Sequence, residues 1–473
     1  MNVMTSHPTR RQMLAAVSAA LTAPHLVAPR LARAASPPSV LAAETRTIEV
    51  KGRAANVFGL TGPDGRPGLT LDPGQRFLFR LHNRLAVPTI IHWHGQTPPP
   101  AQDGVTETGY AGPVAPGDVA DYDFAARPGT HWMHSHLGLQ EMQLLAAPLI
   151  VRSAEEAAAD VQEAVLFLHD FSFKAPEELL AGLGTMDHGA MNHGAMNHGA
   201  MNHGGGMDLN DVEFDAYLAN DRTLDDPEVV RVERGGRVRL RVINGAAATA
   251  FWLEVAGAPA MVLAVDGNAV VPVAAGRVPL AQGQRVDLLI EVPAGAVVPV
   301  FAQREGDRQR TGLILAAPGA AVARLDGMAA QAAPPADLSL DQGLARAGAG
   351  SALPEGAAQR LRLTGSMMPY RWTLDDRAWG EHRPLAAAAG TRMRLDFVNE
   401  SMMAHPMHLH GHHFDVVAID GRPVAGPRRD TVLVPAGATV GIAFDADNPG
   451  RWLLHCHNLL HMATGMMTEV RYG

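Results

Sequence analysis

The sequence contains a single cysteine, Cys456, so no disulfide can form within the chain. It has no block of basic residues and a formal net charge of −9, which argues against nucleic acid or an anionic membrane surface as a partner. Beyond the N-terminal region, no apolar run is long enough to cross a bilayer. Long amphipathic helical patterns are also scarce, which favours a β protein.

The N-terminus has the pattern of an export signal. Arg10 and Arg11 precede an apolar run that reaches about residue 27 and is followed by Ala32-Arg33-Ala34, a small-x-small cleavage pattern. Twin arginines before a short apolar run are typical of the Tat pathway, which exports folded proteins. We therefore predict that residues 1–34 are a Tat signal peptide and that the mature protein is periplasmic. A chance pair of arginines is the alternative.

One strand-like unit recurs three times in the rest of the chain. Residues 74–83, 236–244 and 390–399 each begin with glycine, continue with alternating polar and apolar residues, and end with asparagine. The copies lie about 155–160 residues apart, roughly the length of one domain. We predict domains at 35–155, 156–325 and 326–473.

The composition favours β-sandwiches. The chain has 34 prolines and 48 glycines, which separate short β-branched runs at 46–50, 163–169, 286–292 and 439–444. Residues 318–358, rich in alanine, glycine and proline, are interpreted as a linker into the third domain. The predicted fold class is all-β, with three Greek-key β-sandwiches.

Histidines stand at matched positions after two of the three asparagines. Nine and eleven residues after Asn83 and Asn399 come two His-x-His pairs, whereas the middle copy has apolar residues at these offsets. A second match aligns 128–136 with 449–457, and each of these segments ends in another His-x-His pair. Only the later segment has a thiol, because Ser135 stands where the other has Cys456. The four pairs are His92/His94, His134/His136, His408/His410 and His455/His457.

The stretch around Cys456 predicts two adjacent metal sites. On a strand over 452–457, Cys456 projects to one face and His455 and His457 to the other. His461 and Met466 follow five and ten residues after Cys456, which gives the soft ligand set of a blue-copper centre lacking one histidine. His405 lies three residues before His408, hence on the opposite face, and supplies that histidine. The alternative is that Cys456 is a small buried hydrophobe.

The four His-x-His pairs predict a second, larger centre. Alternate residues of a strand share a face, so each pair aims two imidazoles the same way. Eight neutral imidazoles suit a cluster of three copper ions better than one zinc ion, which four ligands satisfy. One such pair alone is a weak signal, but four in matched register together with the only cysteine are a strong one.

With these motifs the sequence resembles the three-domain multicopper oxidases over nearly the whole mature chain. The motifs are His92-Trp93-His94-Gly95, His134-Ser135-His136, His405-Pro406-Met407-His408-Leu409-His410-Gly411, and His455-Cys456-His457 with His461 and Met466. The resemblance implies three cupredoxin-like sandwiches and four copper ions. It assigns the type 1 ion to His405, Cys456, His461 and, axially, Met466, the type 2 ion to His92 and His408, and the two type 3 ions to His94, His134 and His457 and to His136, His410 and His455.

The resemblance also implies the reaction. A substrate gives single electrons to the type 1 copper, Cys456 and its flanking histidines carry them on, and the cluster reduces O2 to water. The family further suggests a monomer. Protons must reach the cluster, and Asp103 resembles the family's acid beside the type 2 copper; a simple Asp-Gly turn is the alternative. Some copper-tolerance members carry an acid directly after the second type 1 histidine, where this chain has Met462.

A five-residue methionine and histidine repeat occupies 186–207. Glycine in every repeat and the lack of apolar periodicity make a stable helix or strand there unlikely on sequence grounds. Thioether and imidazole groups suit Cu(I), so we predict a copper-recruiting segment; repeat expansion in a loop is the alternative. Its candidate ligands are Met186, His188, Met191, His193, Met196, His198, Met201, His203 and Met207.

Methionines also cluster before the first type 1 histidine. Family members that oxidise Cu(I) carry a methionine two residues before this histidine, which Met403 matches, and an aspartate four before, where this chain has Ser401 beside Glu400. Met402, Met367 and Met368 are further candidates for the same surroundings, and ordinary core packing is the alternative. His131, His412 and His413 fall out of register with the ligands and are interpreted as supporting or structural residues.

Three functions are weighed. The first is a periplasmic cuprous oxidase that protects against copper, and the second is a laccase-like oxidase of phenols and aromatic amines. The third is a protein of this fold without oxidase activity, in a structural or copper-storage role, which the complete ligand set disfavours. The third repeat and the four pairs also disfavour a two-domain nitrite reductase. The reductant is therefore predicted to be Cu(I) or a small phenol, with O2 as acceptor.

Overall fold

The computed structural model describes residues 37–184, 209–233 and 236–473. The predicted signal peptide at 1–34 and the whole methionine and histidine segment at 186–207 lie outside these residues. Ser39–Gly473 form one compact unit, so the three predicted domain boundaries stay predictions. No helix in the described part of the chain is long and apolar enough to cross a membrane.

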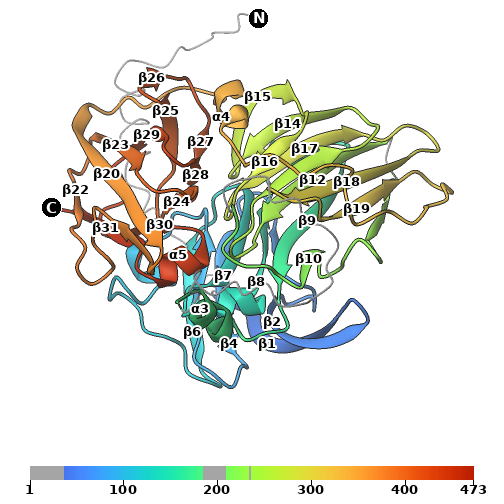
Figure 1. Ribbon diagram of the computed structural model, residues 1–473, viewed down its shortest axis with the longest axis horizontal. Helices are drawn as coiled ribbons and strands as arrows, with labels where there is room; N and C mark the ends of the chain where they lie inside the picture. Colours follow the sequence, from blue (N-terminus) through green and yellow to red (C-terminus); the bar gives the residue numbers. More distant parts are fainter. Residues whose placement is uncertain (1–36, 185–208, 234–235) are drawn as a thin grey trace, which may run out of the picture. The chain divides into compact units, whose positions relative to one another are not determined.

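The strands form three pairs of sheets (Figure 1). In the first pair, hydrophobic residues such as Phe77, Trp93 and Met133 fill the space between the sheets. One sheet has the order β2 (Arg53–Thr61), β1 (Ser39–Val50), β4 (Arg76–Asn83) and β6 (Val119–Ala125), and the other β3 (Leu69–Leu71), β8 (Ala146–Val151), β7 (Gly129–Ser135) and β5 (Ile91–His94).

The second pair encloses a core that includes Leu240, Phe251 and Leu313. One sheet has the order β10 (Ala216–Ala219), β9 (Gln162–Phe171), β12 (Arg237–Asn244), β17 (Arg285–Glu291), β14 (Ala260–Val265) and β15 (Asn268–Ala274). The other runs β11 (Val229–Arg231), β19 (Arg310–Ala316), β18 (Val297–Arg304), β13 (Phe251–Val255) and β16 (Val278–Leu280).

The third pair encloses Leu395, Met407 and Trp452. One sheet has the order β21 (Tyr370–Leu374), β20 (Glu355–Met367), β23 (Arg392–Asn399), β29 (Thr439–Asp445), β25 (Phe414–Ile419) and β26 (Arg422–Pro423), with β27 (Arg428–Arg429) also on β25. The other runs β22 (Leu385–Ala387), β31 (Met467–Tyr472), β30 (Arg451–Cys456), β24 (His405–Leu409) and β28 (Thr431–Val434).

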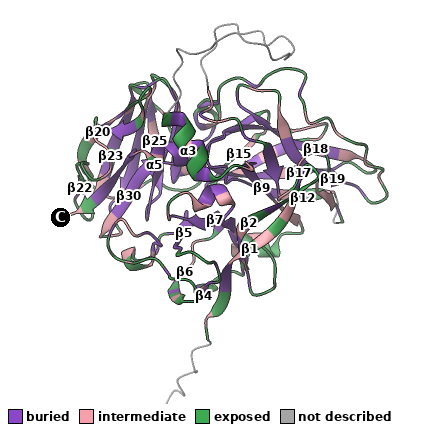
Figure 2. Cartoon of the chain, turned by 60° about the horizontal axis from the view of Figure 1, so that its bottom comes forward, coloured by how far each residue is buried: buried purple, intermediate pink, exposed green. Residues whose placement is uncertain are grey.

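Helices are short. They are η1 (Pro100–Gln102), η2 (Gln140–Gln143), α2 (Ala154–Ala158), α3 (Pro176–Gly184), α4 (Ser339–Gly343) and α5 (Leu459–Ala463). The burial pattern in Figure 2 concentrates on strands such as β5, β7 and β30, which carry the predicted ligands. The predicted all-β class is confirmed, and the strands predicted at 46–50, 163–169, 286–292 and 439–444 lie within or almost wholly within β1, β9, β17 and β29.

The threefold repeat has a structural cause. Strands β4, β12 and β23 each pair in parallel with the first long strand of their own sandwich and antiparallel with a later one. The terminal asparagines are buried, and each carbonyl oxygen accepts the backbone N–H two residues later. Each side-chain amide also donates to backbone carbonyls: Asn83 to Val87 and Val114, Asn244 to Thr249 and Leu280, and Asn399 to Met403, Val434 and Pro435. Asparagine thus fixes the chain that leads to the next strand.

The predicted linker at 318–358 does cross to the third sandwich, but side-chain contacts hold it in place. Trp252 Nε1 donates to Pro334 O at 2.9 Å, and Ala336 N donates to Glu305 Oε2 at 2.8 Å. In α4, Asp341 Oδ1 accepts from Arg429 Nε at 2.5 Å. Composition alone did not reveal these contacts, because the partners lie far away in sequence.

Replacing Asn244 with alanine tests the role of the repeated asparagine in the copy that carries no predicted ligand. Asn244→Ala leaves three buried backbone groups without partners, so unfolding should become easier by roughly 2 kcal/mol or more. Urea unfolding of the copper-loaded mature protein measures this. Asn56→Ala, at an exposed asparagine of β2, should change stability by less than about 0.5 kcal/mol. Equal stability of the two variants would contradict the account.

Candidate metal centres

The first candidate centre lies between β24, β30 and α5. Met407 and Cys456 are register partners on β24 and β30, and His405 stands two residues before Met407. Helix α5 presents His461, and its N-cap Asn458 accepts from the backbone N–H groups of Leu460 and His461. His405, Cys456 and His461 are all fully buried.

The three side chains fit a single soft metal ion. Cys456 Sγ lies 3.6 Å from His405 Nδ1 and 3.6 Å from His461 Nδ1, and the two nitrogens are 3.0 Å apart. Ligand atoms about 2.0–2.3 Å from a central ion stand roughly 3.3–3.7 Å apart, so the arrangement is close to that of a three-ligand site. Burial raises the pKa of the Cys456 thiol and, together with His461, lowers the pKa of His405. Cys456 and His405 are thus neutral unless a cation draws off the thiol proton.

Met466 lies beside these three residues. Its backbone carbonyl accepts from Cys456 N, and its N–H donates to His461 O, both at 3.1 Å. The side chain is fully buried in the hydrophobic cluster that also contains Cys456. These contacts agree with the predicted position of an axial ligand, which stays a prediction.

Several neighbours of this centre could not be found from local spacing. Asp211, just before β10, lies 3.2 Å from the outer nitrogen Nε2 of His461 and accepts from Tyr370 Oη at 2.9 Å. Burial alone would raise the pKa of Asp211, but His461 and the hydrogen bonds lower it overall. Ser401 Oγ lies 2.7 Å from His405 Nε2, and the Trp372 ring packs 4.3 Å from that of His461. The outer nitrogens Nε2 of His405 and His461 therefore both have hydrogen-bond partners.

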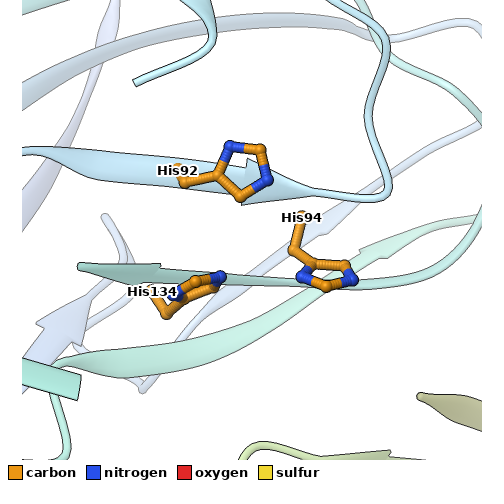
Figure 3. Close-up of side chains that lie close together, drawn as sticks. All are labelled: His92, His94 and His134. Atoms are coloured by element: carbon orange, nitrogen blue, oxygen red, sulfur yellow. The ribbon is translucent and has the colours of Figure 1, made fainter. Parts of the chain in front are cut away.

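The second candidate centre brings all four His-x-His pairs together. His92 and His134 are register partners on β5 and β7, as are His408 and His455 on β24 and β30. Figure 3 shows His92 and His94 on one strand with His134 on its neighbour. The repeat alignment thus corresponds to two matching pairs of strands, one from the first sandwich and one from the third.

The outer nitrogens of most of these rings face carbonyl or carboxylate oxygens, whereas His457 has no such partner. Backbone carbonyls lie 2.9 Å from Nδ1 of His92, His408 and His455. Carboxylates serve three others at 2.8–3.0 Å: Glu141 at His134 Nδ1, Asp430 at His94 Nε2 and Asp103 at His410 Nδ1. Glu107 lies 3.6 Å from His136 Nδ1. These contacts set which nitrogen of each ring faces inward with its lone pair.

The inner nitrogens converge without protein donors. His410 Nε2 lies 3.0 Å and His136 Nε2 3.5 Å from His455 Nε2. Nitrogens of His92, His408 and His410 lie within 4.8 Å of one another. The rings of His94, His134 and His457 have centroids 5.0–5.7 Å apart. The rings thus gather at one place, and which histidines share an ion stays a prediction.

Buried nitrogens without hydrogen-bond partners show whether the cluster suits metal ions. Within the described residues, His92 Nε2, His134 Nε2, His408 Nε2, His94 Nδ1 and both nitrogens of His457 have no hydrogen-bond partner. Burial and the neighbouring histidines lower the pKa of most rings: His94, His134, His408, His410 and His455 far below the usual range, and His457 to about 3. A buried cluster of neutral lone pairs is costly unless metal ions satisfy it, so these residues fit a copper cluster.

Asp103 touches two of the predicted ligand rings. It is buried, with Oδ2 2.9 Å from His410 Nδ1, Oδ1 3.3 Å from His92 Nδ1, and its backbone carbonyl on the same His92 nitrogen. Gly104, which follows with φ +78°, leaves no room for a Cβ because Ile91 O would lie 1.8 Å away. The Asp-Gly pair is therefore both a tight turn and a contact to the cluster.

The middle sandwich supports the cluster without supplying a ligand. Arg285 of β17 is fully buried and donates to both carboxylate oxygens of Asp430 at 2.6 and 2.7 Å, and Asp430 in turn holds His94. Gly283 lies so close to His457 and His94 that an added Cβ would be 2.8 Å from the His457 ring. Neither role has a local sequence signal.

The three histidines predicted to be supporting residues have partners away from the inner face. His412 Nδ1 lies 3.0 Å from His410 O and its Nε2 2.6 Å from Tyr472 Oη. His413 Nε2 lies 2.9 Å from Gly95 O. His131 Nε2 lies 3.3 Å from Pro128 O.

Comparisons with known proteins agree with this geometry. Three family models described as multicopper oxidase match residues 42–156, 166–313 and 353–473. Multicopper oxidase MmcO of Mycobacterium tuberculosis is 31% identical over 429 residues, which are 88% of this chain and 82% of that protein. Copper resistance protein A of Pseudomonas syringae pv. tomato is 26% identical over 555 residues and 90% of each chain.

Solved structures are similar over almost the whole chain. A multi-copper oxidase from Pseudomonas thermotolerans has a TM-score of 0.68 at 25% identity and covers 92% of this chain and 98% of that one. The laccase from Botrytis aclada has a TM-score of 0.71 at 23% identity, covers 92% of this chain and 88% of that one, and shows the fold alone. The predicted cupredoxin-like fold class is confirmed.

Changing Arg285 tests the support from the middle sandwich. Arg285→Met leaves the buried Asp430 without its bidentate partner, which should cost about 3–5 kcal/mol of stability. Arg285→Lys keeps the charge but not the fork of two hydrogen bonds, so it should fall between wild type and Arg285→Met. Urea unfolding measures both. If the methionine variant matched wild type, or the lysine variant were no more stable than the methionine variant, the supporting role would be wrong.

Proposed function

Since the chain belongs to the multicopper oxidases, enzymes that use oxygen as the electron acceptor, we propose that it works in the periplasm as a cuprous oxidase. In this reaction four Cu(I) ions are oxidised to Cu(II), while one O2 takes up four electrons and four protons to give two waters. The twin-arginine pattern at Arg10 and Arg11 supports export after folding. The protein is proposed to act as a monomer.

Four copper ions are proposed as resident cofactors. His405, Cys456, His461 and Met466 would hold one, His92 and His408 a second, and the two remaining sets of three histidines a pair. Bound copper supplies one-electron oxidation at the first centre and dioxygen reduction at the second. The chain separates the two tasks, because Cys456 faces one centre while its covalent neighbours His455 and His457 face the other.

The chain's acids are proposed to serve the two centres differently. Asp103, in contact with both His92 and His410, is positioned to hold a proton beside the cluster. Asp211 fixes the ring of His461 through Nε2, which leaves Nδ1 facing Cys456. Met462, where some copper-tolerance relatives carry an acid, has no group that can move a proton.

The proposal that Cu(I) is the substrate rests on a small cavity beside the first centre. It has a volume of about 180 Å³, and Met402, Met403, Glu305 and Pro406 are among the residues that line it. Met403 is buried, whereas Met402 is 69% exposed at the surface. Pockets for drug-sized organic ligands typically measure about 300–1,000 Å³, so this cavity suits an ion better than a large phenol. Thioethers suit Cu(I). Glu305 supplies a carboxylate in the cavity lining, where this chain has Ser401 at the position of the family's aspartate.

The methionine and histidine segment is proposed to deliver Cu(I) to this cavity. The described chain resumes after this segment at Leu209, which lines the cavity. Two residues later, Asp211 contacts His461 and Asn458 of the first centre. A copper ion released at the end of the segment would therefore arrive next to Met402 and Met403.

Deleting 186–207 tests the substrate and the segment together. At low Cu(I), oxygen uptake by the copper-loaded deletion variant should fall several-fold, because recruitment is lost, while uptake with a dimethoxyphenol should not change. An oxygen electrode measures both substrates on both proteins. Vigorous phenol oxidation with weak Cu(I) oxidation, indifferent to the deletion, would instead establish the laccase-like alternative.

Glu305 provides a second test through pH. Burial raises the pKa of Glu305 to about 7, so its charge appears as the pH rises from 6 to 8. The KM for Cu(I) should therefore drop by about threefold or more over this range in the wild type and stay flat in Glu305→Gln. Glu291→Gln, at an exposed position of β17, is the matched control. A wild-type pH dependence retained in Glu305→Gln would exclude Glu305 from the substrate site.

A further inference from the structure

A second cavity lies between the first and third sandwiches. It has a volume of about 280 Å³ and is lined by Thr97, Arg127, Gly411, His412, His413, Arg428, Asp447 and Asn448. Asn448 joins the two sandwiches at its edge, because Nδ2 donates to Pro98 O and Gly411 O, both at 3.1 Å. The cavity is therefore part of the interface that also holds the histidine cluster, but no predicted copper ligand lines it.

The two arginines of this cavity are half-buried, and they lack the carboxylate partners of the fully buried arginines. Arg241, Arg285, Arg304 and Arg429 each form an ion pair with at least one carboxylate. Among the described residues, neither Arg127 nor Arg428 forms such an ion pair, and the buried Nε atoms of both have no hydrogen-bond partner. The Arg127 side chain makes one hydrogen bond, from Nη2 to the neutral side chain of Asn268.

The local charge is positive. Burial and the nearby Arg428 guanidinium lower the pKa of Arg127 to about 10, although Asp430 and Asp447 act in the opposite direction. Asp447 is the only carboxylate that lines the cavity, and it is exposed. The two histidines are neutral donors or acceptors with protein partners, since burial lowers the pKa of His412 and His413.

We propose that this cavity binds a small tetrahedral oxyanion of the sulfate or phosphate class, held between the guanidinium groups of Arg127 and Arg428. Guanidinium groups present forked N–H donors that match the oxygens of such an anion. The volume holds the anion together with several waters, each of which occupies about 30 Å³. Arg127 lies just before β7 of the first sandwich, and Arg428 lies in β27 of the third. The anion therefore bridges the two sandwiches whose histidines form the cluster.

An anion bound between the two sandwiches should stabilise the folded enzyme. An anion that binds the folded state stabilises it by mass action, and here the stabilised contact is the one between the two ligand-bearing sandwiches. The cavity wall also contacts the cluster, because the His412 side chain, which lines the cavity, has Nδ1 3.0 Å from the backbone carbonyl oxygen of the predicted ligand His410. The proposal does not depend on which substrate the enzyme oxidises.

Isothermal titration of the copper-loaded mature protein with sodium sulfate, at constant ionic strength, tests the site. We expect saturable one-site binding to wild type, weakened at least about tenfold in Arg428→Gln, which removes a charge-assisted pair of donors. Asp447→Asn removes the one opposing charge, so it should tighten binding several-fold. Arg422→Gln, at an exposed arginine of β26, should bind as wild type does.

The variants distinguish the site from general attraction to a basic surface. The half-buried Arg428 side chain makes no hydrogen bond or ion pair within the described residues, so its loss should not disturb folding. Absence of saturable sulfate binding to wild type, equal weakening in Arg428→Gln and Arg422→Gln, or weaker binding in Asp447→Asn would each overturn the proposal. Sodium chloride titrated in parallel should bind far more weakly; equal chloride affinity would overturn the oxyanion class.

Discussion

The structure depends on the burial of eight imidazole rings at one interface. Such a cluster is unfavourable by itself, because the inward-facing lone pairs lose their hydrogen bonds to water, and burial beside other rings disfavours their protonation. Carbonyls and carboxylates hold the outer nitrogens, for example Asp430 at His94 and Glu141 at His134, and so fix the orientation of the rings. Inward-facing nitrogens such as His92 Nε2, His134 Nε2 and His408 Nε2 remain without a protein partner. These free lone pairs fit a metal site better than a strained core.

That constraint explains why a sandwich without ligands is retained between the two that have them. Arg285 and Gly283 of the middle sandwich reach the cluster through Asp430 and through close packing on His457. Asp211, which precedes the middle sandwich's β10, fixes His461 at the other centre. Residues of the middle sandwich thus contact the outer side of both centres. Its own buried asparagine, Asn244, fixes a loop in the same way as Asn83 and Asn399 do in the other two sandwiches.

Much of this could be predicted from the sequence because the information was local or repeated. Spacing of two residues places His92 and His94 on one face of a strand, and the threefold repeat aligned the strands of separate sandwiches. Asp211, Asp430, Glu305 and Arg285 could not be found in this way. Their partners are as far as 336 residues away, as for Asp430 and His94, and no periodicity relates them. The stretch predicted as a linker, 318–358, leads into β20, but its attachment through Asp341 and Ala336 depends on packing that composition does not encode. The roles of 186–207 stay predictions.

The most direct test of the account is the copper content of the loaded mature protein, compared between wild type and Cys456→Ser. If Cys456 belongs to one centre and the eight histidines to an independent cluster, the wild type should hold four copper ions per chain and the variant three. Loss of all copper in the variant, or a wild-type content of one or two ions, would contradict two separate centres built from these residues.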